Sequence, residues 1–294
     1  MNRSFREGVL PVDKPVGPTS HDVVAVARRA LGLRRVGHTG TLDPFASGLL
    51  LLCVGGATRL AEFLTGMDKT YEATALLGVA TDSEDRDGEV VSRSEGWRLV
   101  GEAAVREALS ALTGTILQVP PRFSAKKVGG VAAHRLARQG TEVELPPKEV
   151  VVHRLELVSF DAPEVRFRVR CSSGTYVRSL ARDLGESLGV GAHLTTLRRT
   201  AVGRFSVDGA LALDDLSREE LVSAASLTPA DALADFPRVV LDEAGARDVG
   251  HGRPVAAALP DGGPVAALVG RDLVAIGEVR GGQFLPRKVL VGRA

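Results

Sequence analysis

Residues 37–48 read Gly-His-Thr-Gly-Thr-Leu-Asp-Pro-Phe-Ala-Ser-Gly, a stretch dense in glycine, threonine and proline. Such residues break helices and central strands, so the stretch is predicted to be a loop with Asp43 near its middle. The plainest interpretation of Asp43 is a turn residue whose carboxylate binds nearby backbone N–H groups. A phosphate-binding loop is disfavoured because no Gly-Lys-Ser/Thr follows the glycines. Taken alone, the loop leaves both a structural and a chemical role open for Asp43.

The segments on both sides of this loop are predicted to be regular structure. The apolar run 49–54 is typical of a buried strand, so the loop enters the core. Upstream, a short strand at 9–12 leads through a turn to a helix. Thr19 with Asp22 forms a capping-box pattern at the start of that helix, and Gly32 closes it.

Further along the chain, strand and helix patterns alternate irregularly. Residues 70–77 alternate apolar and polar side chains, which predicts a half-buried strand with Tyr71 facing inward. The pattern predicts a helix at 101–112 and a hairpin with a Gly-Gly turn at 126–131. It also predicts two paired strands, 150–160 and 165–171, followed by a second helix that residues 172–175 cap. The predicted fold class is therefore α+β, with a mixed, largely antiparallel sheet flanked by helices.

The composition shifts near residues 227–237, where prolines flank an Ala/Asp stretch. Beyond it lie a short helical pattern at 241–249 and short strand patterns separated by Gly and Pro, at 265–269, 274–279 and 288–291. We therefore divide the chain into a large domain, 1–234, and a small β-rich domain, 235–294. The small domain is near the lower size limit for independent folding.

The bulk composition excludes several classes of protein. The 294 residues are 44% hydrophobic and 25% charged, as in a globular protein. No run approaches the roughly 20 apolar residues of a membrane span, and the N-terminus lacks a signal core, so we expect a cytoplasmic protein. The 2 cysteines are far apart and the 6 histidines show no ligand spacing, which argues against disulfides and metal sites.

The charges are segregated along the chain although the net charge is only +1. Three stretches contain arginine or lysine and no acid: 24–41, 116–141 and 191–207. Such runs are often simply solvated faces, but a one-sided basic surface also suits the phosphates of a nucleic acid.

Five ordered motifs between residues 9 and 205 carry a family resemblance. In sequence order they are VDKPVGPTS (12–20), GHTGTLDPFASG (37–48), KTYEA (69–73) with GVATDSEDRDG (78–88), QVPPRFSAK (118–126) with ARQG (137–140), and CSSGTYVRSL (171–180) with GAHL (191–194) and LRRT (197–200). They resemble the TruB family, the bacterial tRNA pseudouridine-55 synthases. The loop alone is moderately specific, whereas the ordered set is very specific.

The resemblance implies a pseudouridine synthase fold with a small PUA-like RNA-binding domain at the C-terminus. It also implies an isomerase that converts the T-loop uridine of tRNA to pseudouridine, as a monomer without cofactor or metal. Turning uridine into pseudouridine requires breaking the glycosidic bond, rotating the base and rejoining it through carbon, which suits a carboxylate. Asp43 is then the catalytic residue. Attack on the sugar, attack on the base and removal of a sugar proton all need it in the same place.

The same resemblance assigns the substrate-binding residues. Arg178 is the fixed cation that keeps Asp43 ionised in a largely dry pocket. Tyr71 and Tyr176 are the residues that stack on the flipped uridine and line the pocket. Leu197 completes the apolar wall, and His38 helps to fill the space vacated in the RNA stack. Lys14 is not a substrate-binding residue in this assignment but a structural one that supports the catalytic loop.

One departure and two alternatives stand beside this assignment. His134 occupies a position where the family commonly has tyrosine, which puts an aromatic contact in doubt. One alternative is a tRNA-binding or tRNA-folding protein that recognises the T arm by shape. The other is a related guide-RNA-dependent synthase, against which the segment 45–47 and the compact C-terminus argue.

Overall fold

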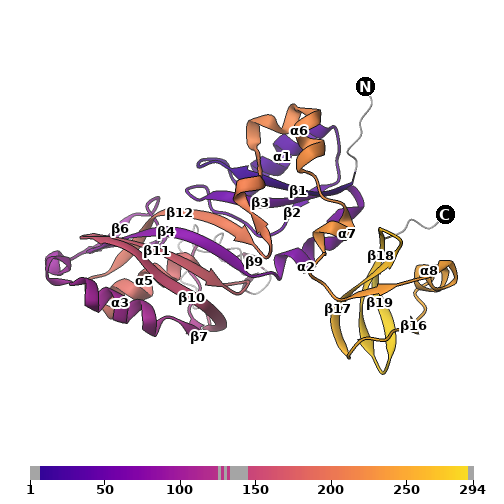
Figure 1. The fold of residues 1–294 in the computed structure, drawn as a ribbon. Helices are drawn as coiled ribbons and strands as arrows, with labels where there is room; N and C mark the ends of the chain where they lie inside the picture. Colours follow the sequence, from indigo (N-terminus) through magenta and orange to yellow (C-terminus); the bar gives the residue numbers. More distant parts are fainter. Residues whose placement is uncertain (1–6, 125–126, 129–130, 133–144, 291–294) are drawn as a thin grey trace. The chain divides into compact units, whose positions relative to one another are not determined.

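The structure, a computed structural model, describes residues 7–124, 127–128, 131–132 and 145–290. Two compact units account for the chain (Figure 1). The first takes residues 1–42, 49–65 and 204–294, and the second takes residues 43–48 and 66–203. The chain thus enters the second unit briefly at the loop that carries Asp43, returns to the first, and enters the second again.

The N-terminal part of the first unit is a small sheet covered by a helix. Strand β1 (Gly8–Lys14) lies between β14 (Leu211–Ala212) and β3 (Ser47–Val54), and β2 (Val36–His38) pairs antiparallel with β3. Helix α1 (Ser20–Leu31) packs its apolar face on this sheet. The predicted capping box is confirmed, because Thr19 and Asp22 bond reciprocally, and Gly32 ends the helix at φ 63°.

Short elements complete this part of the unit. They are η1 (Gly55–Leu60), α2 (Ala61–Thr65), β13 (Phe205–Ser206), η3 (Val207–Gly209), η4 (Leu213–Ser217), α6 (Glu219–Ala225) and α7 (Pro229–Ala232). Leu211, Leu216 and Val222 join the core that α1 and β1 form. Residues 211–222 therefore complete a hydrophobic core whose other members come from the N-terminal elements β1, α1, β2 and β3.

Residues 238–289 form a β-rich part with a sheet and an apolar cluster of its own. The strand order is β15 (Arg238–Val240), β17 (Gly262–Val269), β18 (Asp272–Arg280), β19 (Gln283–Val289) and β16 (Val255–Ala256). Helix α8 (Glu243–Gly250) confirms the helical pattern predicted there. Strand β19 begins earlier than predicted because a bulge accommodates Pro286, which the sequence reading took as a strand breaker.

The second unit is built on an antiparallel sheet. In order, its strands are β12 (Ala192–Val202), β4 (Lys69–Leu77), β11 (Glu164–Cys171), β10 (Lys148–Asp161) and β7 (Gly114–Gln118). The first residues of β3 pair in parallel with β12. Short antiparallel pairs are β5 (Val79–Thr81) with β6 (Val90–Arg93), and β8 (Lys127–Val128) with β9 (Val131–Ala132). The second pair confirms the predicted hairpin, although Lys126 and its Gly-Gly turn lie outside the described residues.

Two helices and a 3-10 turn accompany that sheet. Helix α3 (Glu102–Ala111) packs on β10, and α5 (Val177–Ser187) packs on β12 and β4; the two helices also contact each other (Figure 1). The 3-10 turn is η2 (Glu95–Leu99). Alternation along β4 is strict, with Tyr71 on the buried side, as predicted. The mixed, largely antiparallel sheet flanked by helices is therefore confirmed.

One helix start was predicted wrongly. Residues 172–175 do not cap α5, which begins at Val177 without any side-chain cap bond. The hydroxyl of Ser172 is used elsewhere, because it accepts a hydrogen bond from the backbone N–H of Val151 at 2.9 Å. Within the described residues, no helix is long and apolar enough to cross a membrane.

Candidate active site

Asp43 lies where the loop before β3 makes a tight turn. The backbone N–H of Ala46 donates to the carbonyl of Asp43 at 3.1 Å, with Pro44 at the second turn position, where its fixed φ fits. The residue before Asp43 is also held: Leu42 exchanges two hydrogen bonds with the hydroxyl of Ser20, at 2.8 and 3.1 Å. The side chain of Asp43 is 35% exposed, so its carboxylate is accessible from a fixed backbone.

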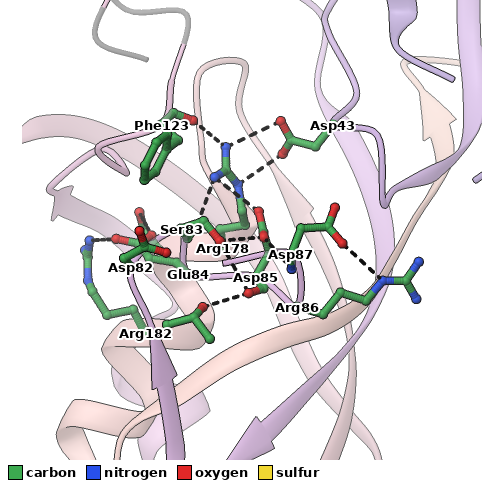
Figure 2. A network of polar contacts seen from close by, with 12 residues as sticks. Asp43, Asp82, Ser83, Glu84, Asp85, Arg86, Asp87, Phe123, Arg178 and Arg182 are labelled. Atoms are coloured by element: carbon green, nitrogen blue, oxygen red, sulfur yellow. Dashed lines mark hydrogen bonds and ion pairs between the residues drawn. The ribbon is translucent and has the colours of Figure 1, made fainter. Parts of the chain in front are cut away.

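The guanidinium of Arg178, on the first turn of α5, holds this carboxylate from one side (Figure 2). Its Nε lies 3.0 Å from Oδ2 of Asp43, and its Nη2 donates to Oδ1 at 3.4 Å. The Arg178 side chain is only 6% exposed. A planar fork that meets both carboxylate oxygens fixes orientation as well as charge.

The remaining donors of Arg178 are also occupied. Nη2 donates to the carbonyl of Phe123 at 2.9 Å, and Nη1 donates to the carbonyl of Ser83 at 2.9 Å. Nη1 also lies 3.4 Å from Oδ2 of Asp85, whose side chain is 8% exposed. All three nitrogens of the guanidinium therefore face acceptors: two carboxylates, Asp43 and Asp85, and the two carbonyls.

Asp85 is itself fixed within the loop that follows β5. Its Oδ1 accepts from the hydroxyl of Ser83 at 2.6 Å and from the backbone N–H of Asp87 at 3.1 Å. The hydroxyl of Thr81 donates to the backbone carbonyl of Asp85 at 2.7 Å. Arg178 is therefore held between a half-buried carboxylate, Asp43, and a buried one, Asp85.

Tyr71 lies on the buried face of β4, within range of the charge of Asp43. It stands opposite Val169 on β11 and Arg199 on β12. Burial raises the pKa of the Tyr71 hydroxyl, the charge of Asp43 raises it further, and the charge of Arg199 and a hydrogen bond to its side chain lower it. The phenol of Tyr71 is therefore neutral and close enough to Asp43 to sense its charge.

Leu197 shares that face of the sheet. It pairs with Ala73 on β4 and, like Arg199 two residues later on β12, is buried. On this face of the sheet the Ala73–Leu197 pair is the neighbour of the Tyr71–Arg199 pair, so the apolar wall predicted at Leu197 lies close to Tyr71.

Lys69, the first residue of β4, adds a buried amine to the same face. Its Nζ donates to the carbonyl of Met67 at 2.6 Å. Burial, helped by the charge of Arg199, lowers the pKa of Lys69 to about 8, whereas Cys171 and Asp68 raise it. Burial raises the pKa of the Cys171 thiol to about 11, so this thiol stays protonated near neutral pH.

Tyr176 immediately precedes α5 and is half-buried. The amide side chain of Gln118 holds its backbone on both sides: Nε2 donates to the carbonyl of Tyr176 at 3.1 Å, and Oε1 accepts from its N–H at 2.8 Å. Gln118 is buried at the end of β7. The side-chain amide of Gln118 thus satisfies the backbone N–H and carbonyl of Tyr176 in place of a neighbouring strand.

His38 and Lys14 belong to the first unit. The ring of His38, at the end of β2, meets the ring of His21 edge-on, with centroids 5.3 Å apart. Lys14 is fully buried and donates to the carbonyls of Pro15 and Pro18 at 2.9 and 2.7 Å. Lys14 therefore fixes the turn that leads into α1.

The structure brings Asp43, Arg178 and Tyr71 together in the second unit, with Leu197 on the same sheet face. Sequence reasoning gave no individual role to Asp85, Arg199 or Gln118, although each lies inside a matched motif. Alternation along β12 could have found Arg199, because a residue two places from an inward Leu197 shares its face. Among the described residues, no cluster of three or more His, Cys, Asp or Glu side chains could hold a metal ion. His134 and the ARQG motif (137–140) lie outside the described residues.

Two family models match the chain. A TruB family pseudouridylate synthase N-terminal domain matches residues 28–177, and a tRNA pseudouridylate synthase B C-terminal domain matches residues 178–235. The tRNA pseudouridine synthase B of Thermobifida fusca is 49% identical over 97% of this chain and 99% of its own length. The protein of the same name from Burkholderia lata is 45% identical, covering 99% and 92%.

Solved structures share the fold. A chain of an H/ACA RNP bound to a substrate RNA containing 2'-deoxyuridine matches with a TM-score of 0.75 and 28% identity, covering 97% of this chain and 86% of that one. A chain of a Cbf5-Nop10-Gar1 complex gives a TM-score of 0.76 and 29% identity, covering 97% and 85%. The motifs, the fold and the near full-length relatives agree, and the chain belongs to the TruB family of pseudouridylate synthases.

Proposed function

We propose that this protein isomerises the T-loop uridine of tRNA, at position 55, to pseudouridine, with Asp43 as its catalytic carboxylate. The single observation that supports this most directly is the fork of Arg178 on an accessible Asp43, beside the buried Tyr71. The curated relatives are tRNA pseudouridine synthases at 45–49% identity. The reaction class follows from the family, and the ion pair supports the choice of Asp43 as the catalytic residue.

The reaction exchanges one bond to the ribose for another. The bond from C1′ to N1 breaks, a bond from C1′ to C5 forms, C5 loses a proton and N1 gains one. A uridine inside a folded loop must first leave the base stack, and an aromatic ring commonly holds the flipped base. We assign that stacking to Tyr71, with Tyr176 and Leu197 lining the pocket and His38 occupying the gap left in the RNA.

The polar groups of the site suit this chemistry. Asp43 must remain an anion to attack covalently or to remove a sugar proton, and Arg178 stabilises that anion at short range. Because Asp85 and two backbone carbonyls also hold the guanidinium of Arg178, it stays in place while Asp43 reacts. The neutral phenol of Tyr71 can take part in moving the C5 proton only as a relay, giving up its own O–H proton as it accepts the one from C5.

The guide-RNA-dependent type is a weaker proposal for this chain. The Cbf5 structures that match are 28–29% identical, well below the 45–49% of the curated tRNA pseudouridine synthases B. We therefore propose a monomer that reads the T arm directly, in the cytoplasm, with residues 1–234 as the catalytic domain and 235–294 as a PUA-like RNA-binding domain.

A shape-recognising tRNA-folding protein is the second candidate, and one substitution separates it from an enzyme. Asp43→Asn should leave tRNA affinity within about twofold and abolish the release of tritium from tRNA labelled at C5 of uridine. Turnover of Asp43→Asn near the wild-type rate would contradict the catalytic role of Asp43. Binding and refolding of tRNA should persist in the variant if the second activity also exists.

The substrate class has its own test. An isolated T-arm stem-loop should be isomerised if the catalytic domain reads that arm, whereas the same stem-loop with cytidine in place of the target uridine should not react. A requirement for intact tRNA, or for an added guide RNA, would contradict direct reading of the T arm.

A further inference from the structure

Glu84 is the one non-glycine residue in the described part of the chain whose backbone has a positive φ, at 63°. A left-handed backbone costs free energy in a residue with a side chain, so its presence calls for a compensating role. The conformation is held by two hydrogen bonds: the N–H of Glu84 donates to the carbonyl of Thr81 at 3.2 Å, and its carbonyl accepts from Leu194 at 3.0 Å. This backbone turns the Glu84 side chain inward, where it is buried.

The carboxylate of Glu84 meets Arg182 of α5 (Figure 2) and also Ser179 of the same helix. Its Oε2 accepts from the hydroxyl of Ser179 at 2.9 Å, and its Oε1 from Nη1 of Arg182 at 2.5 Å. Ser179 follows Arg178 directly, and Arg182 lies one helical turn after it. Burial raises the pKa of Glu84, and the charge of Arg182 opposes that rise.

Ser179 and Arg182 share a further acceptor. The carbonyl of Val119 lies 3.0 Å from the hydroxyl of Ser179 and 3.0 Å from Nη2 of Arg182. Arg182 also bonds Asp183, so its charge is balanced on both sides. Through its side chain, Glu84 thus links the loop after β5 to α5. Ser179 and Arg182 of α5 in turn contact Val119, the start of a further segment.

These are the segments that supply acceptors to Arg178. Ser83 and Asp85, on either side of Glu84, bind Nη1 of Arg178, and Phe123, four residues after Val119, binds Nη2. A shift of either segment would rotate the guanidinium and with it the fork on Asp43. Misplacement of about 1 Å at a reacting group can cost roughly 100-fold in rate.

We infer that Glu84 is a positioning residue for the isomerisation: through Ser179, Arg182 and Val119 it fixes the groups that aim Arg178 at Asp43. This inference rests on the proposed catalytic role of Asp43. Glu84 itself is placed in the network that surrounds Arg178, with no role in the transfer of the base.

The chain allows the positioning role to be separated from a merely structural one. Glu84→Gly removes the carboxylate and also the backbone strain, because glycine adopts this φ readily. Glu84→Gln removes the charge but keeps the contacts, since the amide oxygen can accept from Arg182 and the amide nitrogen can donate to Ser179. Glu102→Ala breaks an exposed ion pair with Arg106 on α3 and is the matched control.

Single-turnover rates, tRNA dissociation constants and thermal midpoints of full-length variants test the inference. We expect Glu84→Gly to slow the single turnover roughly 10- to 100-fold, with tRNA affinity within about twofold and a melting temperature close to wild type. Glu84→Gln should recover most of the rate, and Glu102→Ala should match wild type. Arg182→Ala should add little to Glu84→Gly, because both act on one network.

Two results would overturn the inference. A wild-type rate in Glu84→Gly would do so, as would rates that fall equally in the Gly and Gln variants in step with their melting temperatures. Asp43→Asn, measured in parallel, keeps the outcomes apart: if it is active, the proposed function fails, and if it is inactive while Glu84→Gly is normal, only the positioning role fails.

Discussion

Nε of Arg178 lies 3.0 Å from Oδ2 of Asp43 although the two residues are 135 positions apart, and Nη2 of the same guanidinium reaches Oδ1. The side-on fork fixes the plane of the carboxylate as well as its charge, which a point charge would not do. Lysine at position 178 keeps the charge and loses the fork.

Arg178→Lys should therefore retain tRNA binding and lose turnover. We expect a fall in kcat of roughly 100-fold or more, because the Lys ammonium cannot meet both oxygens of Asp43 and leaves the carbonyls of Ser83 and Phe123 without their donors. Steady-state kinetics with tRNA, compared with the exposed control Arg106→Lys, would check it. A variant that changes KM alone would contradict the orienting role.

Gly48, the last residue of the loop motif, cannot carry a side chain. Its φ is +106°, and an added Cβ would lie 2.2 Å from the carbonyl oxygen of Arg199. Gly48→Ala should lower the free energy of unfolding by roughly 3 kcal/mol, from the clash and the strained backbone together. Gly37→Ala, in the same motif, meets nothing within 4 Å and should change stability by less than about 1 kcal/mol. Urea unfolding of both variants is the measurement.

Tyr71→Phe keeps the ring and removes a buried hydroxyl that is hydrogen-bonded to Arg199. Stacking on the flipped base should survive, so tRNA affinity should stay within about twofold. Turnover should fall roughly 100-fold or more if the phenol takes part in moving the C5 proton. A solvent isotope effect on the single-turnover rate would report that step, and Tyr71→Leu, which also loses the ring, should weaken tRNA binding in addition. Unchanged turnover in Tyr71→Phe would limit Tyr71 to stacking.

Lys69 should make stability depend on pH above neutrality. The pKa of Lys69 is about 8 in the folded protein, compared with 10.5 for an ordinary lysine. Between pH 8 and pH 10.5 the amine is therefore largely protonated in the unfolded chain and largely neutral in the folded protein. The free energy of unfolding should therefore rise with pH in that window, by about 2 kcal/mol from pH 7.5 to 9.5 relative to Lys69→Met. Urea titrations of the two proteins at both pH values measure this difference. Parallel pH profiles would show that Lys69 has an ordinary pKa.

The parts of the fold that could be read from the sequence are those that local rules determine. Thr19, Asp22 and Gly32 mark the ends of α1 because caps depend on neighbouring residues only. Strict alternation placed Tyr71 inside. Ser172 was misread as part of a helix cap because its hydroxyl bonds a strand more than 20 positions away, which no local pattern reveals.

The candidate site was predictable where residue type carries the chemistry. Asp43 and Arg178 came from motif resemblance, and the structure places them in contact. The acceptors at Ser83 and Phe123 are backbone carbonyls, which any residue offers, so nothing in the sequence points to them. Glu84 escaped notice because its importance lies in a left-handed backbone and in contacts with Ser179 and Arg182, 95 and 98 positions away.

The full set of acceptors around Arg178 also limits how this arginine can act on RNA. Binding of a phosphate by arginine displaces condensed counterions and makes affinity fall with salt. Arg178 is buried and already contacts Asp43, Asp85 and two carbonyls, so a phosphate would have to displace these acceptors. We therefore expect the ionic-strength dependence of tRNA binding to come from other arginines and lysines, which are exposed to the phosphates.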